Sequence, residues 1–147
     1  MGMIEEVALH LSETSTRFVA GVSMFANAHP PVDVASFSMW ETGGGPPVQA
    51  YGSTLPTWEE PTLQLLAKTT RPSSGSLVPY SSNARSLIHD ALVILNRVVN
   101  QSLTGSTAYY LRIEPRQAVA VLPGQEEDGR IMFSVNLDVL RRPSVTY

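Results

Sequence analysis

The sequence predicts an α+β fold in which an antiparallel (mixed) β-sheet carries two α-helices on one face. Two stretches repeat apolar residues at the 3.6-residue period of a helix, and several shorter stretches alternate apolar and polar residues as strands do. The expected order is a helix, two or three strands, a long helix and a strand pair, which is typical of a sheet covered by helices on one side. The 147 residues suffice for one core, so we expect a single domain over residues 1–147.

The first element is a short amphipathic helix over residues 3–13. Its apolar residues recur at helical spacing, as one face of a helix requires. Glu5, Glu6 and His10 fall on the other faces of this helix. The apolar residues that share the spacing are Ile4, Val7, Ala8 and Leu11.

Two strands are expected next. Residues 18–26 are apolar and irregular and fit one short strand. Residues 35–41 alternate, with Phe37 and Met39 on one face, and predict a second strand. The Gly-Gly-Gly-Pro-Pro run at residues 43–47 is expected to end that strand sharply, since glycine and proline interrupt regular structure.

A loop, a strand and a flexible connection follow. Residues 48–60 include Gly52 and Pro56 and are expected to form a long loop. Residues 61–68 predict a further strand that opens with a proline. Residues 72–79 are rich in Ser, Gly and Pro, which indicates a flexible connection.

The clearest helix comes after this connection. Its apolar residues keep helical spacing for about five turns, and Gly105 is the expected terminator. Polar residues such as Arg85, His89 and Arg97 fall between them. The apolar positions are Ala84, Leu87, Ile88, Ala91, Leu92, Leu95 and Val98.

The last predicted unit is a pair of strands. Tyr109, Leu111 and Ile113 are expected on one face of the first strand, which continues through residues 117–122. Residues 123–130 form a charged turn. The return strand shows the strongest alternation in the chain, with five apolar residues on one face: Ile131, Phe133, Val135, Leu137 and Val139.

Charge and composition exclude several functions. The net charge is −3, and Arg141-Arg142 is the densest cationic pair, which argues against nucleic-acid binding through a basic patch. An acidic surface is compatible with DNA that only passes by as cargo. The chain has no cysteine, so it can form no disulfide, thiolate zinc site or cysteine nucleophile.

No membrane or secretory segment is expected. The first residues carry Glu5, Glu6 and Glu13, unlike a signal peptide. No apolar run approaches the roughly 20 residues that cross a bilayer. We therefore expect a soluble protein.

No residue pattern predicts catalysis or metal binding. His10, His29 and His89 are far apart in sequence and have no partners at ligand spacing. The glycine run at residues 43–45 is followed by prolines and lacks the lysine of a phosphate-binding loop, and the serines of residues 73–76 lack a nucleophile elbow. Neighbouring carboxylates point to opposite faces of a strand, and no calcium-loop spacing is present. We expect no catalytic residue, no metal, no cofactor and no enzymatic activity.

The succession of motifs resembles the phage tail-terminator (tail-completion, minor capsid) proteins. In that family a strand and a Gly-Gly pair precede an Arg-Pro-x-Val-Gln-Val strand and a helix that ends in Leu-x-Gly. Here residues 40–47 read Trp-Glu-Thr-Gly-Gly-Gly-Pro-Pro, residues 60–65 read Glu-Pro-Thr-Leu-Gln-Leu, and Leu-Thr-Gly follows the long helix. Glu60 stands where arginine is common in the family.

The C-terminal part resembles the family more closely. Residues 110–115 read Tyr-Leu-Arg-Ile-Glu-Pro and are followed by a turn with Gly124 and Asp-Gly-Arg. Residues 133–139, Phe-Ser-Val-Asn-Leu-Asp-Val, are similar to the family's aromatic-x-x-Asn-aromatic-x-Val strand. Leu137 stands where phenylalanine is common.

The resemblance implies a virion protein at the head-proximal end of the tail, assembled in the host cytoplasm. Such a subunit forms a ring, usually a hexamer, that caps the tail tube, stops its polymerisation and joins it to the head or neck. Its implied partners are copies of itself, the major tail tube protein and the neck or connector proteins, with DNA only as cargo and no membrane. Another connector (neck, stopper or head-completion protein) and a small ligand-binding domain remain alternatives.

Contacts between subunits are expected at loops, strand edges and the charged hairpin tip, which would order on meeting a partner. No catalytic or metal residue is assigned. The expected interface residues are Gly43, Gly44, Gly45, Arg71, Glu126, Glu127, Asp128, Arg130 and Asn136.

Overall fold

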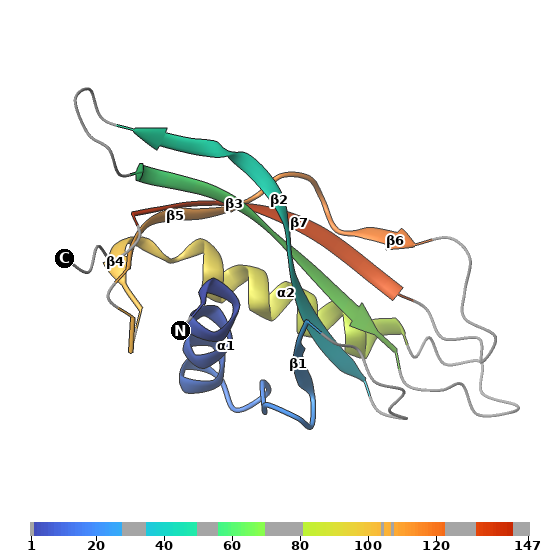
Figure 1. Cartoon of the computed structure of the whole chain (residues 1–147). Coiled ribbons are helices and arrows are strands. Elements are labelled where there is room, and N and C mark those ends of the chain that lie inside the picture. Colours follow the sequence, from blue (N-terminus) through green and yellow to red (C-terminus); the bar gives the residue numbers. More distant parts are fainter. Residues whose placement is uncertain are drawn as a thin grey trace, which may run out of the picture.

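The computed structural model describes residues 2–27, 35–49, 56–69, 81–103, 105–106, 108–122 and 132–142. It contains a mixed seven-stranded sheet with two helices on one of its faces (Figure 1), which confirms the predicted α+β class. The strands lie in the order β1-β2-β3-β7-β5-β4, and β6 pairs with β7. In chain order the elements are α1 (Met3–Thr14), β1 (Met24–Ala26), β2 (Ser36–Gln49), β3 (Pro56–Lys68), α2 (Ser81–Asn96), β4 (Val99–Ser102), β5 (Tyr109–Pro115), β6 (Ala120–Leu122) and β7 (Met132–Arg142).

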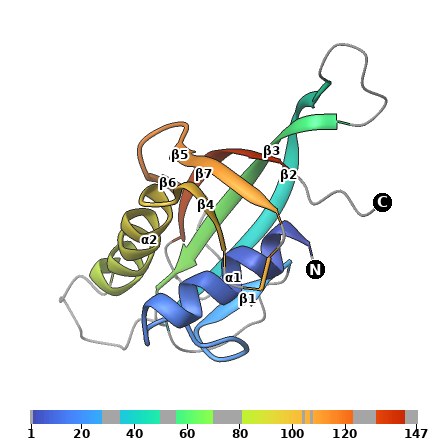
Figure 2. The same ribbon diagram turned by 90° about the vertical axis from the view of Figure 1, so that its left-hand side faces the viewer.

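The two helices lie on the same side of the curved sheet (Figure 2). Each turns its apolar stripe towards the strands, because burial of that stripe supplies most of the stability of a helix in a protein. Val7 and Leu11 of α1 and Ile88 and Leu95 of α2 are fully buried there. Both predicted helices are present.

The core lies between the helices and the inner face of β2, β3 and β7. Alternate residues of these strands have no exposed surface, as expected where side chains point to opposite faces in turn. Phe18, which precedes β1, packs edge-on against Phe37 with ring centroids 5.3 Å apart. The fully buried strand residues of this layer include Phe37, Met39, Leu63, Leu65 and Val135.

The predicted end of the second strand at the glycine-proline run is wrong. β2 continues through residues 43–47 to Gln49, and β3 already begins at Pro56, so the expected loop over residues 48–60 is largely strand. Proline is tolerated because β1 pairs with β2 only as far as Met39, which leaves this stretch as a sheet edge where no neighbour needs its N–H. Shifts in the β2–β3 pairing register after Thr42 accommodate the glycines and prolines within β2.

These ends of β2 and β3 form a two-stranded ribbon, here called the arm. It consists of residues 45–49 of β2 and residues 56–58 of β3, beyond the last β3–β7 pair, Glu59 with Arg141. The arm protrudes from the rest of the sheet (Figure 2). The arm is defined by the course of its backbone.

The flexible connection that was expected at residues 72–79 lies outside the described residues.

The long helix is shorter than predicted. α2 ends at Asn96 and not near Gly105, and the unpredicted edge strand β4 follows. Val98 keeps helical spacing and is buried, but its N–H bonds to the oxygen of Leu95 in a tighter final turn. Asn100 has a φ of 50° and so interrupts any further helix.

The face of β5 was also predicted wrongly. Tyr110 and Ile113, three residues apart, are both buried, whereas Tyr109 and Leu111 are only partly so. The pairing register with β7 shifts between Tyr110 and Arg112, so β5 has one residue more than β7 at this point, and the alternation of faces is offset. The return strand follows the prediction, because the described members of its apolar face are all buried: Phe133, Val135, Leu137 and Val139.

Candidate functional site

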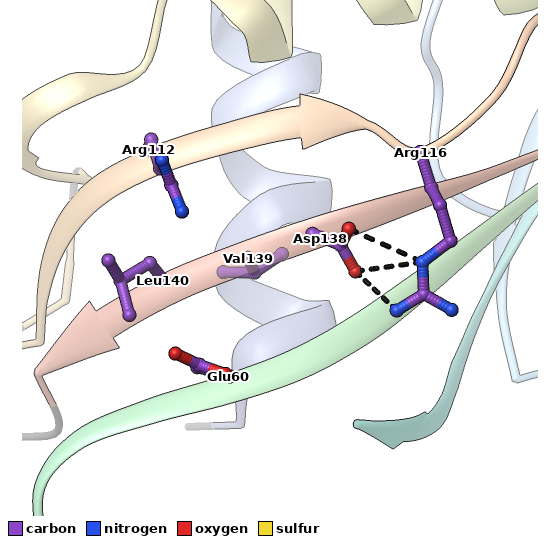
Figure 3. A pocket seen from close by; sticks show the side chains of 6 residues that line it. All are labelled: Glu60, Arg112, Arg116, Asp138, Val139 and Leu140. Atoms are coloured by element: carbon purple, nitrogen blue, oxygen red, sulfur yellow. Dashed lines mark hydrogen bonds and ion pairs between the residues drawn. The ribbon is translucent and has the colours of Figure 1, made fainter. Parts of the chain in front are cut away.

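The face of the sheet that carries no helix bears a polar hollow (Figure 3). It is formed by β3, β5 and β7, whose outward side chains lie side by side because β7 pairs with both other strands. Acidic and basic side chains both lie there, and Leu140 provides an apolar side chain. The lining residues are Glu60, Arg112, Arg116, Asp138, Val139 and Leu140.

One ion pair dominates this hollow. Arg116, just after β5, directs its guanidinium at Asp138 of β7, with Nη2 at 2.5 Å and Nε at 3.1 Å from Oδ1. Arg116 Nη2 also lies 3.4 Å from the hydroxyl of Thr62. The hydrogen bond and charge of Asp138 raise the pKa of Arg116. The two charges neutralise each other, so the centre of the hollow has little net charge.

The ionisable side chains of the hollow are carboxylates and guanidinium groups. Its lining has no histidine, serine or lysine that could act as nucleophile or general base. Within the described ranges, no group of three or more histidines and carboxylates is placed to hold a metal ion.

A second, buried network ties four elements together at the base of the arm. Tyr110 of β5 donates its hydroxyl to Glu6 of α1, and Arg141 of β7 lies 3.4 Å from Glu6 Oε2 and 3.3 Å from the hydroxyl of Tyr110. Arg141 Nε donates to Glu59 of β3 at 2.9 Å. Because Glu59 is the last β3 residue beside β7, this network fixes the strands at the point where the arm begins.

Tyr110 stays protonated in this setting. Burial, followed by the hydrogen bond to Glu6, raises the pKa of Tyr110 well above its ordinary value. The guanidinium of Arg141 also lies over the ring of Tyr110, 5.9 Å from its centroid. A neutral hydroxyl donor and a cation therefore compensate the buried carboxylate of Glu6.

Sequence reasoning missed this network. It placed Glu6 on a polar helix face, whereas the residue is 4% exposed. A buried carboxylate needs a donor and a countercharge, and these come from residues more than 100 positions away. No local pattern in α1 could have revealed them.

A third surface feature, an acidic hollow, lies beside the base of the arm. Gly43 and Gly44 belong to it together with Glu41, Glu59 and Glu60. A Cβ atom on Gly44 would lie 1.9 Å from the carbonyl oxygen of Glu60, so only glycine allows β2 and β3 to approach this closely. At Gly43 a Cβ would meet nothing within 4 Å.

The structure brings some of the expected interface residues together and leaves others apart. Gly43, Gly44 and Gly45 lie consecutively in β2 at the base of the arm. Asn136 lies on β7, opposite Gln64 of β3, and its carbonyl accepts from the N–H of Arg116. The remaining predictions fall outside the described residues: Arg71, Glu126, Glu127, Asp128 and Arg130.

Comparison with models of known protein families gave no match, and a search of curated proteins gave none either. Neither helix in the described part of the chain has the length and apolar character that crossing a bilayer requires.

Proposed function

We propose that this protein is a structural subunit of a phage tail that assembles into a ring and acts as a tail terminator. The ring, expected to be a hexamer, would cap the tail tube, stop its growth and present a surface to the neck proteins. The proposal combines the order of motifs in the sequence with the geometry of the arm. It assigns the protein no chemistry and no cofactor.

The arm is the observation that carries the proposal. In the described part of the chain, no third strand pairs with either edge of the arm, and both edges present unpaired backbone groups. A two-stranded ribbon is marginally stable by itself in water. Such a ribbon is stabilised when a neighbouring molecule covers it, so we infer that the arm lies against an adjacent subunit.

The helix-free face supports the same function. Arg116 and Asp138 form an ion pair on this face. Arg112 pairs with Glu114 on the same face at 3.7 Å. A face of paired charges gains little from the counterion release that drives DNA binding. It therefore suits a contact between proteins or a wall along which DNA passes as cargo.

The first test is the mass of the protein in solution, measured by light scattering over a range of concentrations. A closed ring, formed alone or on addition of tail tubes of the same phage, is the expected result. A protein that stays monomeric and does not bind tail tubes would overturn the proposal, and would favour another connector or a ligand-binding domain.

A second test removes the arm. A variant that joins Gly45 to Glu59 through an Asn-Gly turn keeps the base of the ribbon and loses its outer part. We expect it to fold and to lose ring formation. Val93→Ala, an exposed change on α2, serves as the control and should leave the ring intact. A ring that forms equally well without the arm would contradict the role given to it.

A further inference from the structure

The pairing between β3 and β7 ends where the arm begins. Its last pair is Glu59 with Arg141, and the next residue of β3, Trp58, pairs with Val48 of β2 inside the arm. Within the described strands, the backbone of the arm is therefore paired with itself and not with β7. A two-stranded ribbon twists more strongly than a wide sheet, so side-chain contacts at its base decide the direction in which the arm points.

Arg142, the last residue of β7, provides such a contact. Its guanidinium carbon lies 5.8 Å from the ring centroid of Trp58 and 5.6 Å from that of Tyr109. Both distances are within the roughly 6 Å at which an aromatic ring attracts a cation. The planar guanidinium group is also suited to stacking on aromatic rings. Arg142 therefore joins the first residue of the arm to strand β5.

Tyr109 is itself held in place. It is the partner of Arg142 in the β5–β7 pairing, and its hydroxyl donates to the carbonyl oxygen of Asn100 in β4 at 2.8 Å. A ring that is fixed at both its backbone and its hydroxyl is a firm support for the guanidinium group. The three side chains form a row across β3, β7 and β5, here called the outer row: Trp58, Arg142 and Tyr109.

The outer row lies on the opposite face of the sheet from the buried network. Consecutive side chains of a strand point to opposite faces, and Arg141 contacts Glu6 of α1 on the helix side. Arg142 therefore lies on the helix-free face. Arg141 contacts Glu59 of β3 and Tyr110 of β5, and Arg142 contacts the residues next to these two in sequence. The two arginines thus hold the base of the arm from both faces.

The two arginines differ in what their loss would do. Arg141 compensates a buried carboxylate, so its removal would leave an unpaired charge in the core. Arg142 is exposed, and its removal leaves no buried charge behind. Arg142 can therefore be changed without a demand on the core, which separates the direction of the arm from the stability of the fold.

We propose that Arg142 is the positioning residue of the arm: held between Tyr109 and Trp58, it keeps the arm in the one direction in which it meets the adjacent subunit. The inference rests on the role of the arm in the ring proposed above. It adds the side chain that orients the arm before the neighbour arrives, which lowers the entropy lost on association.

Spin labels on two introduced cysteines measure the direction of the arm, because the natural chain has no cysteine. Gln49→Cys lies at the end of β2 in the arm, and Val93→Cys lies on the exposed side of α2. Double electron–electron resonance gives the distribution of distances between the labels. Each labelled protein is diluted with an excess of its own unlabelled form, so that distances within one subunit are recorded.

Three variants of Arg142 and its match are compared by this measurement. Arg142→Ala should broaden the distance distribution. Arg142→Lys keeps the charge and loses the planar group, so it should broaden the distribution less. Arg85→Ala is the matched control, because Arg85 is also exposed and lies over an aromatic ring, 5.4 Å from the centroid of Phe133, but far from the arm. It should leave the distribution unchanged.

Light scattering then tests the consequence for assembly. An exposed contact of this kind should hold the arm so that its loss raises the concentration for half-assembly of the ring about two- to fivefold. Trp58→Ala should have the same effect as Arg142→Ala. The two changes combined should add nothing further, because both remove one contact. The urea midpoint of Arg142→Ala should stay close to that of the natural chain.

Each outcome has a defined meaning. A distance distribution as narrow in Arg142→Ala as in the natural chain would overturn the proposal. So would a broadened distribution with unchanged ring assembly, because the direction of the arm would then not serve assembly. If the natural chain forms no ring, the terminator role fails, while broadening in Arg142→Ala but not in Arg85→Ala would still support Arg142 as the residue that orients the arm.

Discussion

The pair of strands β2 and β3 has two regions, one with a regular pairing register and one with an irregular register. Over the helices, residues 36–42 pair with residues 62–68 without interruption, and the apolar side chains that face the helices, such as Phe37 and Leu65, are buried. Beyond Thr42 the register shifts three times before Gln49. A slip by one residue would turn every buried side chain outward, so the core fixes the register of the first region and places no such demand on the second.

The core-packed part of β2 and β3 is expected to determine the stability of the subunit, and the arm is expected to determine its assembly. The body of the pair contributes buried apolar surface, and its mutations are expected to change the free energy of unfolding. The arm has no core to lose, so changes there are expected to affect association with a neighbour. The base of the arm, where Glu59 and Gly44 lie, belongs to both regions.

The largest expected effect comes from a truncation in the body. Leu65→Ala leaves a cavity under the helices and should lower the free energy of unfolding by about 2–5 kcal/mol, measured by urea denaturation. Trp58→Ala in the arm removes a larger side chain, which is only partly buried and lies under the guanidinium of Arg142. Trp58→Ala should lower the free energy of unfolding by clearly less than Leu65→Ala does. Equal losses would remove the distinction between body and arm.

Gly44→Ala should have the next largest effect. The new methyl group collides with the backbone of Glu60 and Pro61, and relief requires the strands to separate. A loss of about 1–3 kcal/mol is typical of such overpacking. Gly43→Ala is the matched control, because its methyl group meets nothing within 4 Å. Urea midpoints of the two variants test this, and a pair of equal midpoints would contradict the close approach at Gly44.

Tyr110→Phe tests the network at the base of the arm. Loss of the donor to Glu6 should cost about 1–2 kcal/mol near neutral pH. The folded pKa of Tyr110 lies above its ordinary value of 10.0, so its contribution is present below pH 10 and is lost as the pH rises towards the folded pKa. The variant should therefore lose less stability between neutral and alkaline pH than the natural chain. Parallel pH profiles would exclude this role.

Arg116→Ala should have the smallest effect. Both partners of the Arg116–Asp138 pair are about half exposed, and water screens such pairs strongly. The melting temperature should not change measurably. A clear decrease in melting temperature would mean that the polar hollow contributes to the stability of the single subunit as well as offering a surface.

Periodicity predicted the parts of the fold in which burial alternates regularly. The apolar face of β7 and the stripes of α1 and α2 were found correctly because one face of each packs on the core. The same reasoning failed where something other than burial decides. Proline at residues 46–47 indicated a break, but an edge without a neighbour needs no N–H donor there.

Pairing partners explain the other failures. Tyr110 faces the core because a register shift against β7 moves it there, and β4 exists because β5 offers an edge to Val99. Glu6 is buried because Tyr110 and Arg141 compensate its charge. Each of these facts depends on residues distant in sequence. The glycine run was correctly singled out as special, but only the structure distinguishes Gly44, which the strand pairing requires, from Gly43.

The position of β7 has a consequence for how the chain is made. Among the described strands, β7 is the last in sequence, yet it lies between β3 and β5 and is the one that joins them. During synthesis, the ribbon of β2 and β3 and the ribbon of β4 and β5 have no common strand until β7 leaves the ribosome. The two ribbons therefore become parts of one sheet only after β7 has been made, so the centre of the sheet forms after the other described strands.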